Sequence, residues 1–482
     1  MTQRSLALST DLYELAMAAA YFESGMTKDH AIFELFIRRL PRGRSFLITA
    51  GLEQALEYLD NFRLTSSEVE YVRAHPAFKD VSREFFDYLS NLRFTGDIWA
   101  MPEGTLTFGM EPILRVEAPI IEAQIVETFL LSAINFQTMI ASKAARVVTA
   151  AAGRDVIEFG TRRAHGTEAG LYAARAAYIG GCIGTSNVEA GHLFGVPTFG
   201  TLAHSFVMSF DREQDAFRAF LKSFPHTATV LVDTYDTVAA VQHLASEFGS
   251  AVSAVRLDSG DLCRLSIEVR DMLDRAGMTH TQIFASGDLN ENRIAELLAD
   301  GARIDAFGVG TELATSYDSP ALSGVYKLVA LRQNGEWRMR VKLSEDKHTY
   351  PGAKQVWRIV DESGTFVRDV VALEDETGLA NILEREGVAR PLVNRVMTRG
   401  KSILPIPSVS SPPSEAREQR FANLKQARAR SDESLKSLPR ELRSLDSATT
   451  YSVSFSNQLS DRRDQLERDL RSVTAREGKT KR

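Results

Sequence analysis

Between residues 155 and 311 the chain repeats one pattern: a short apolar segment that ends in small, hydroxyl-bearing or acidic residues. The seven segments are VIEFGT, GCIGTSN, PTFGTLAHS, TVLVDTY, AVRLDSGD, IFASGD and AFGVGT. Most are separated by stretches with helical periodicity. Apolar strands that alternate with amphipathic helices are typical of a parallel sheet buried on both faces. Seven such units favour a closed or nearly closed seven-stranded β/α barrel, and a doubly wound open sheet is the alternative.

The flanking segments predict a different architecture. Before the barrel, Ser9–Gly25 has the pattern of a helix, and the apolar runs that follow it indicate an α+β domain. After the barrel, Asn334-Gly335 and Ser363-Gly364 mark the turns of two β-hairpins that would pack on the N-terminal domain. We therefore expect four parts: an N-terminal α+β domain (1–120), the β/α barrel (121–322), a β-rich segment (323–400), and a linker with a charged, solvated helical tail (401–482).

Three aspartates follow apolar segments of the predicted barrel: Asp233, Asp258 and Asp288. The carboxyl ends of parallel strands meet at one edge of a sheet, so these carboxylates should face one mouth. Grouped carboxylates can bind sugar hydroxyls or a magnesium ion that bridges to phosphates. The alternative is that each aspartate caps the helix that follows its strand.

Glycines and hydroxyls accompany these carboxylates in Ser259-Gly260, Ser286-Gly287 and the FGVGT segment. In FGVGT, Gly308 and Gly310 leave the backbone open and Thr311 adds a hydroxyl, an arrangement suited to a phosphate group. A GxG sequence by itself is also a common tight turn.

Cationic groups also stand at the predicted strand ends. Arg162-Arg163 and Arg256 favour an anionic substrate there, because a buried charge is costly without a partner. The alternative is that they pair with Glu158 and the nearby aspartates.

His204 is the most conspicuous histidine, because it lies beside Thr201 and Ser205 at a predicted strand end. It can serve as a base, as a nucleophile that accepts a phosphoryl group, or as a structural hydrogen-bonding residue. The residues alone do not choose among these roles.

Composition excludes several other classes of protein. The net charge of −6 gives no reason to expect a nucleic-acid partner, and the two cysteines, Cys182 and Cys263, are too few for a disulfide framework. We found neither a signal peptide nor a long uncharged apolar stretch, so we expect a cytoplasmic protein without a membrane partner.

Several motifs in order resemble the nicotinate phosphoribosyltransferase family. They are STDLYELAMAAAYF, FELFIRRLP, EFGTRRAHG, GTSNVEAGHLFGVPTFGTLAHSF, LVDTYDT, AVRLDSGDL, FGVGTEL and LSGVYKLV, and they cover roughly residues 9–375. The resemblance implies an irregular α/β barrel joined to an α+β domain built from both chain ends, and a homodimer with shared active sites. It also implies synthesis of nicotinate mononucleotide from nicotinate and phosphoribosyl pyrophosphate in NAD salvage, coupled to ATP hydrolysis through a phosphohistidine.

The same resemblance implies roles for individual residues. His204 matches the phosphorylated histidine, and Tyr13 would reach the nicotinate pocket from the partner subunit. The other positions comprise Arg162 and Arg256 for substrate carboxylate or phosphate, Thr201, Ser205, Gly308, Gly310 and Thr311 for substrate binding, Asp233 and Asp258 for ribose and metal, and Phe129 near the pyridine ring. Mg²⁺ would be held mainly by the substrate phosphates. Nicotinamide phosphoribosyltransferase, quinolinate phosphoribosyltransferase and a nucleotide-binding sensor are the competing hypotheses.

Overall fold

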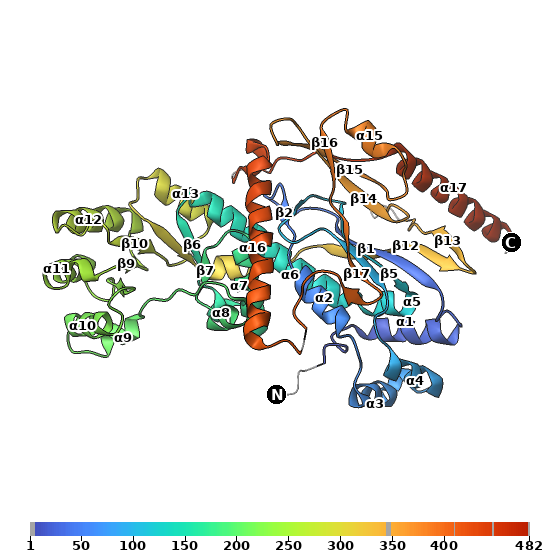
Figure 1. The fold of residues 1–482 in the computed structure, drawn as a ribbon, viewed down its shortest axis with the longest axis horizontal. Helices are drawn as coiled ribbons and strands as arrows, with labels where there is room; N and C mark the ends of the chain where they lie inside the picture. Colours follow the sequence, from blue (N-terminus) through green and yellow to red (C-terminus); the bar gives the residue numbers. More distant parts are fainter. Residues whose placement is uncertain (1–4, 344–348, 409, 446–447, 481–482) are drawn as a thin grey trace. The chain divides into compact units, whose positions relative to one another are not determined.

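The computed structural model of the protein describes residues 5–343, 349–408, 410–445 and 448–480 (Figure 1). Its contacts divide the chain into two compact units. Unit 1 comprises residues 1–138, 321–408 and 432–482, and unit 2 comprises residues 139–320 and 409–431. Both chain ends thus contribute to unit 1, and a short piece of the C-terminal region packs with unit 2.

Unit 1 is built on an antiparallel seven-stranded sheet with the order β13-β12-β1-β5-β3-β17-β18. The strands are β1 (His30–Ile37), β3 (Asp97–Ala100), β5 (Pro112–Pro119), β12 (Gly324–Gln333), β13 (Glu336–Met339), β17 (Asn394–Thr398) and β18 (Lys401–Ser402). β12 pairs with β1, and the predicted β12–β13 hairpin is confirmed. Asn334 and Gly335 both have positive φ, as a two-residue type I′ turn requires.

Helices and smaller sheets complete unit 1. The helices are α1 (Leu12–Glu23), α2 (Leu52–Asp60), α3 (Ser66–Ala74), α4 (Arg83–Asn91), α5 (Ile120–Ile125), α15 (Leu379–Leu383) and α17 (Asn457–Thr480). β2 (Leu47–Ile48) pairs with β4 (Leu106–Thr107), and a four-stranded sheet has the order β16 (Val388–Pro391), β14 (Lys354–Val360), β15 (Phe366–Leu373) and β19 (Val453–Phe455). The predicted β14–β15 hairpin is confirmed.

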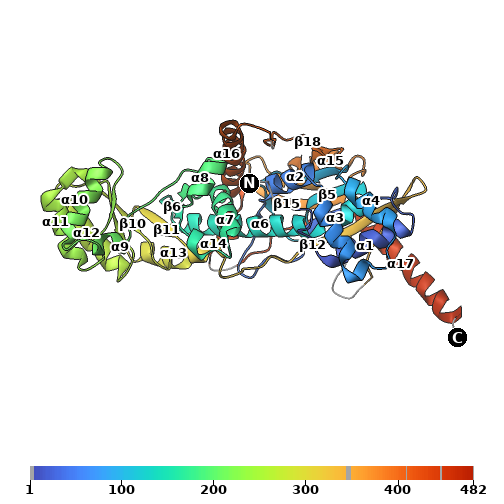
Figure 2. The same cartoon turned by 90° about the horizontal axis from the view of Figure 1, so that it is seen from below.

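Unit 2 contains a parallel six-stranded sheet with the order β7-β6-β11-β10-β9-β8 (Figures 1 and 2). Its strands are β6 (Asp155–Glu158), β7 (Gly184–Thr185), β8 (Thr229–Leu231), β9 (Ala254–Leu257), β10 (Gln282–Ala285) and β11 (Ala306–Val309). Between them lie α7 (Thr167–Ile179), α8 (Val188–Phe194), α9 (His204–Met208), α10 (Glu213–Ser223), α11 (Thr237–Glu247), α12 (Leu262–Arg275) and α13 (Glu291–Ala299), and α14 (Thr311–Ala314) follows β11.

The prediction of a seven-stranded barrel was wrong in the number of strands. Six of the seven apolar segments form strands of the sheet, and PTFGTLAHS contributes only a single bridge between Thr198 and Thr185. Pro197 lacks an N–H group and Gly200 favours irregular backbone, so this segment is a poor strand. Within the described residues the sheet is therefore an open, parallel half-barrel whose edge strands are β7 and β8.

The C-terminal tail is helical, as predicted, but its description as a solvated appendage was wrong. α16 (Pro413–Ser437) buries Leu424 and Ala427, and further along the tail Tyr451 and Leu459 are buried. β19 pairs with β15, so this part of the tail completes a sheet of unit 1. The tail carries few apolar residues, but these four are packed inside the units to which their segments belong.

One long apolar stretch, Ile120–Ala150, comprises α5 and α6 (Glu127–Ala150). It is long and apolar enough to cross a membrane by length and composition, but 67% of its most apolar window is buried inside the protein. A core helix of a folded domain has the same properties.

Glu122 of α5 makes the stability of unit 1 sensitive to pH. Burial raises the pKa of its carboxyl group to about 7, although Thr95 donates hydrogen bonds to it from its N–H (2.6 Å) and its hydroxyl. A carboxyl group with a raised pKa in the folded state contributes its full stability below the usual pKa, and this contribution is lost as the pH rises through 7.

Glu122→Gln should therefore remove part of this pH dependence. When the pH is raised from 5 to 8, the free energy of unfolding of the variant should fall by about 1–3 kcal/mol less than that of wild type. Urea unfolding of both proteins at the two pH values measures this difference. Glu84→Gln, at an exposed position of α4, is the control and should leave the difference unchanged. Equal pH dependence in wild type and Glu122→Gln would contradict the assignment.

Candidate functional site

A cavity of about 780 Å³ lies at the carboxyl ends of the parallel strands of unit 2. This is where ligands bind in open α/β sheets, because the strand-to-helix loops converge there. Its lining includes Phe159, Thr161, Arg162, Arg163, Ser186, Val188, Thr198, Phe199, Thr201, Arg256, Asp258, Ser286, Gly287, Asp288, Gly308, Gly310, Thr311 and Glu312. Seven of the residues singled out from the sequence as catalytic or substrate-binding thus line one cavity.

Arg256 stands at the centre of a hydrogen-bonded cluster. Its guanidinium group donates to Ser286 Oγ (2.8 Å), Thr201 Oγ1 (2.8 Å) and Asp258 Oδ1 (2.6 Å). The side chain is only 14% exposed and lies over the ring of Phe159. One cation therefore joins three separate segments: the end of β9, the end of β10 and the loop before α9.

Asp258 links this cluster to His204. Burial raises the pKa of the Asp258 carboxyl group, but the hydrogen bond from Ser286 and the charge of Arg256 outweigh it and hold the pKa below its usual range. His204 Nε2 lies 4.0 Å from Asp258 Oδ2, and His204 Nδ1 lies 3.2 Å from Thr234 Oγ1. The imidazole is 41% exposed, so it is both oriented by neighbours and accessible.

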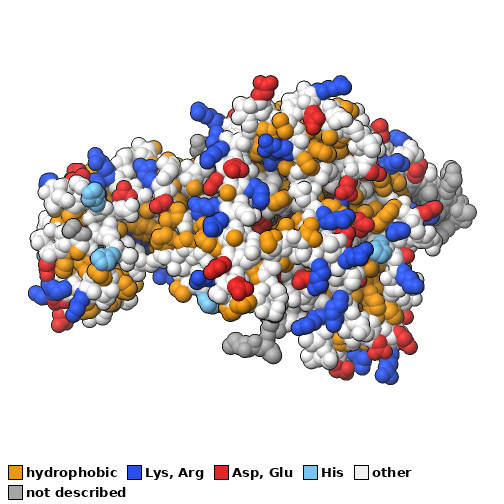
Figure 3. Space-filling model, in the orientation of Figure 1, with side chains coloured by type: hydrophobic (Ala, Val, Ile, Leu, Met, Phe, Trp, Pro, Cys, Tyr) orange, Lys and Arg blue, Asp and Glu red, His pale blue; other side chains and the backbone are white. Residues whose placement is uncertain are grey.

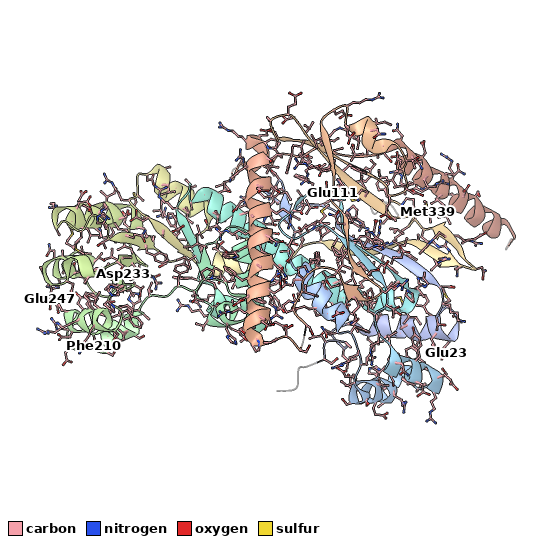
Figure 4. All side chains as sticks on the ribbon, viewed as in Figure 1. Glu23, Glu111, Phe210, Asp233, Glu247 and Met339 are labelled. Atoms are coloured by element: carbon pink, nitrogen blue, oxygen red, sulfur yellow. The ribbon has the colours of Figure 1, made fainter. Side chains whose placement is uncertain are left out.

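Asp233, labelled in Figure 4, supports the end of β9. Its Oδ2 accepts hydrogen bonds from the Asp258 N–H (3.0 Å) and the Ser259 hydroxyl (2.7 Å). Its other carboxylate oxygen is buried and has no hydrogen-bond partner among the described residues.

The strand-end aspartates are not helix caps. The helices that follow β8, β9 and β10 are capped by the side chains of Asp236, Asp261 and Asn290. All three strand-end aspartates precede those caps in the chain, so the capping alternative does not account for them.

Gly287 allows the ends of β9 and β10 to approach closely. Its φ is +94°, and a Cβ atom at this position would overlap the carbonyl oxygen of Asp258. Asp288, the next residue, also has a positive φ of 43°. Only glycine fits at residue 287 without displacing the backbone that carries Asp258.

Arg162 and Arg163 present cationic groups to the cavity. They belong to a short 3-10 turn after β6, and both are exposed. The alternative of pairing with Glu158 or a nearby aspartate is not observed for these two arginines, although Arg256 does pair with Asp258. Glu158 is fully buried and accepts hydrogen bonds from Thr185 Oγ1 (2.5 Å) and the Gly160 N–H. Within the described residues no ion pair is formed by either arginine, so both are available to an anion.

The FGVGT segment lies beside the arginine turn, because β11 pairs with β6. Gly308 cannot carry a side chain, since a Cβ atom would lie 2.8 Å from the rings of Phe159 and Phe284. Gly310 has room for one, so its role is not steric. Both glycines line the cavity, and their expected role toward a phosphate stays a prediction.

An ion-pair cluster around the buried Lys143 lies next to the FGVGT segment. Lys143 of α6 pairs with Glu291 (2.7 Å) and Asp318 (2.8 Å). Glu312, which lines the cavity, approaches the same ammonium group to 4.0 Å. The cluster fixes the start of α14 to the neighbouring helices.

His204 and Asp233 contact Asp258 of the lining without lining the cavity themselves, and three other residues named from the sequence lie elsewhere. Ser205 is exposed in α9 and does not line the cavity. Tyr13 is in the first turn of α1 in unit 1 and is 50% exposed, and Phe129 is buried in unit 1 against Tyr58. Their proposed roles toward a substrate stay predictions.

Sequence reasoning missed several residues that shape the site. Thr234 contacts His204 and could have been noticed because it directly follows a strand-end aspartate. Thr185 braces two strand ends through its bond to Glu158, which the sequence suggested only as a partner for the arginines, and its motif GTSN gave a weak signal. Lys143 lies within the apolar α6, where nothing in the local sequence indicates a buried ion pair.

Fold and site together define a class of protein. An open parallel α/β sheet whose carboxyl edge carries exposed arginines, a histidine–aspartate pair and glycine turns is suited to binding an anionic or phosphorylated small molecule. Residues 8–135 match the model of the nicotinate phosphoribosyltransferase (NAPRTase) N-terminal domain, and residues 155–350 match the model of the nicotinate phosphoribosyltransferase (NAPRTase) family.

Individual proteins agree with these matches. A nicotinate phosphoribosyltransferase of Mycobacterium tuberculosis is 46% identical over 459 residues, which cover 94% of this chain and 92% of the relative. That of Bacillus subtilis is 46% identical and covers 77% of each chain. The crystal structure of human nicotinic acid phosphoribosyltransferase superposes with a TM-score of 0.81 at 29% identity, covering 95% of this chain and 99% of the human one. The chain therefore belongs to the nicotinate phosphoribosyltransferase family.

Proposed function

We propose that the protein joins nicotinate to the ribose of phosphoribosyl pyrophosphate, forming nicotinate mononucleotide and pyrophosphate in NAD salvage. The observation that carries this proposal is the cavity of unit 2, which brings the unpaired Arg162 and Arg163 together with the Arg256–Asp258 pair, beside His204. In a chain 46% identical to nicotinate phosphoribosyltransferases over most of its length, such a cavity fits a carboxylate and a phosphate together.

The reaction needs little covalent chemistry from the protein. The bond between C1 of the ribose and the pyrophosphate oxygen breaks, and the ring nitrogen of nicotinate forms the new bond to C1. Positioned cations stabilise the departing negative charge, and the walls hold the two reactants in line. Arg162 and Arg256 hold anionic groups, whereas Gly310 and Thr311 offer backbone and hydroxyl donors to a phosphate.

Magnesium fits this site as an ion held mainly by substrate. Within the described residues no group of three or more His, Cys, Asp or Glu side chains forms a metal site. The buried, unpartnered oxygen of Asp233, with Asp258 beside it, supplies carboxylate oxygens of the kind that Mg²⁺ prefers. When bound, the ion would neutralise charge on the pyrophosphate.

His204 is proposed to accept the γ-phosphoryl group of ATP, with ADP as the leaving product, and to lose it later to water. Its accessible imidazole and its contacts with Thr234 and Asp258 support a nucleophilic role. The added negative charge would lie at the cavity edge, where it would help to order cation and substrate.

The remaining expectations concern partners and location. A homodimer with shared active sites would explain why Tyr13 and the neighbouring Leu12 are exposed apolar side chains on α1. On the face shown in Figure 3, acidic and basic side chains are interspersed, which accords with a small-molecule substrate and no nucleic acid. We propose a cytoplasmic enzyme without a membrane partner.

Product formation resolved by mass tests the proposal. Wild type, His204→Ala and the control His226→Ala, which changes an exposed loop histidine, would be supplied with phosphoribosyl pyrophosphate, Mg²⁺ and either nicotinate or nicotinamide, with and without ATP. We expect nicotinate mononucleotide, stimulated by ATP in wild type and His226→Ala but not in His204→Ala. Preference for nicotinamide would refute the proposal that the arginines of the cavity bind the nicotinate carboxylate. Equal stimulation of His204→Ala and wild type by ATP would refute the phosphohistidine.

A further inference from the structure

The C-terminal helix α16 contacts the catalytic half-barrel although it lies beyond the residues that match the family models. Its first part, up to Ser431, belongs to unit 2. Phe421 on this part packs over Gly195, where a Cβ atom would lie 2.8 Å from the phenylalanine side chain. Phe421 also lines a second cavity of about 550 Å³, which shares Val188 and Thr198 with the first. The cavity next to α16 and the candidate site thus share two lining residues, Val188 and Thr198.

Arg428 makes the most specific contact of this helix. Its guanidinium group donates hydrogen bonds to the backbone carbonyls of Gly181 (2.8 Å) and Cys182, and it lies over the ring of Tyr178, 4.8 Å from the centroid. These carbonyls lie beyond the last turn of α7, so the helix offers them no N–H partner. Arg428 thus ties two carbonyls of this turn to α16, in addition to the backbone hydrogen bonds that Gly181, Cys182 and Ile183 donate.

From this turn, β7 leads directly to the cavity. Thr185 ends β7, and its hydroxyl donates to the buried Glu158. Glu158 in turn accepts from the N–H of Gly160, which begins the turn that carries Arg162. The Ser186 N–H also donates to the Glu158 carbonyl (2.9 Å). A short series of hydrogen bonds thus connects Thr185 at the end of β7, the strand whose start Arg428 anchors, to the cationic wall of the cavity.

We propose that Arg428 is a positioning residue for the reaction: from the C-terminal helix it holds β7, and through Thr185 and Glu158 it sets the Arg162 turn. The effect passes through the backbone of β7 rather than through direct contact with Arg162. The FGVGT segment stands on β11, which lies beyond β6 in the strand order, and is farther from this anchor. Loss of Arg428 should therefore weaken binding of the one anionic substrate that Arg162 holds, a consequence that rests on the proposed function.

Steady-state kinetics of Arg428→Lys and Arg428→Ala test this role. Lysine keeps the charge and most of the side-chain stem, so Arg428→Lys should fold even if Arg428→Ala does not. It cannot donate to both carbonyls in the same geometry, so the contact is still lost. We expect KM for one substrate, nicotinate or phosphoribosyl pyrophosphate, to rise about 10-fold while the other KM stays within about 2-fold. Gln426→Ala, at an exposed position of the same helix, is the matched control.

Thr185→Val tests the path. It removes the hydroxyl that reaches Glu158 and should raise the same KM, and the double variant Arg428→Lys/Thr185→Val should be no worse than the stronger single variant. Unchanged KM values, an equal rise in both, or fully additive effects would overturn the proposal.

Hydrogen exchange separates this inference from the proposed function. In Arg428→Lys the amides of residues 183–187 should exchange faster, whereas those of β10 should not change. A wild-type chain that forms no nicotinate mononucleotide would refute the proposed function, and the exchange result alone would then decide the inference. Exchange that is unaltered, or accelerated throughout unit 2, would overturn it.

Discussion

Arg256→Ala should lower kcat/KM for nicotinate mononucleotide formation by about three orders of magnitude. The guanidinium group makes three hydrogen bonds to Ser286, Thr201 and Asp258, and its removal leaves all three without their common donor. The pKa of Asp258 would rise toward its usual range because the charge of Arg256 helps to lower it. Steady-state kinetics with saturating Mg²⁺ measure the loss.

Two further variants separate chemistry from folding. Arg256→Lys keeps the charge but replaces a three-way donor with a compact ammonium group, so we expect a loss of about two orders of magnitude. Arg270 in α12 is covered to a similar degree, with 12% of its side chain exposed, and bonds to Asp274 and to two carbonyls remote from the cavity lining. Arg270→Ala should reduce stability yet leave kcat/KM of the folded enzyme nearly unchanged. Equal losses in the Arg256 and Arg270 variants would contradict a catalytic role for Arg256.

Gly287→Ala should destabilise the protein by about 3 kcal/mol and reduce kcat/KM by at least about 100-fold. The new methyl group would overlap the Asp258 carbonyl oxygen, in a backbone conformation with φ of +94° that alanine rarely adopts. Either the β9 end or the β10 end has to move, and both carry members of the Arg256 cluster. Urea unfolding and steady-state kinetics measure the two effects.

Gly277 offers a control with the same kind of backbone but no crowding. It has φ of +74°, and a Cβ atom there would meet nothing within 4 Å. Gly277→Ala should therefore cost only the conformational strain, about 1 kcal/mol, and leave kcat/KM unaltered. If the two glycine variants behaved alike, close approach at Gly287 would not be what organises the site.

Much of unit 2 could be predicted because its signals are local. Apolar strands followed by Asp233 and Asp258 mark the edge at which parallel strands end, and α11 and α12 follow from helical periodicity. The cavity gathers Arg162, Arg256 and Thr311 for this reason. Recognition of family motifs added the identity of the substrates, which strand ends alone cannot indicate.

What could not be predicted depends on pairing between distant residues. Pro197 and Gly200 make PTFGTLAHS a poor strand, but its single bridge to Thr185 depends on the strand that lies beside it, which the local sequence does not indicate. The packing of the C-terminal tail likewise depends on isolated residues such as Leu424 and Tyr451, which carry no periodic signal. The Lys143 ion pairs join three segments that are far apart in the chain.

Because the half-barrel is not closed, the backbone N–H groups of the loop before α9 are not used in its sheet. A closed barrel would use the amide groups of residues 200–203 in its own ladder, whereas here they donate no hydrogen bond within the described part of the chain. Thr201 and His204 thus stand on a backbone whose donors are still uncommitted. Because the sheet is not closed here, the N–H groups of this loop are left available to an anion that enters from the cavity.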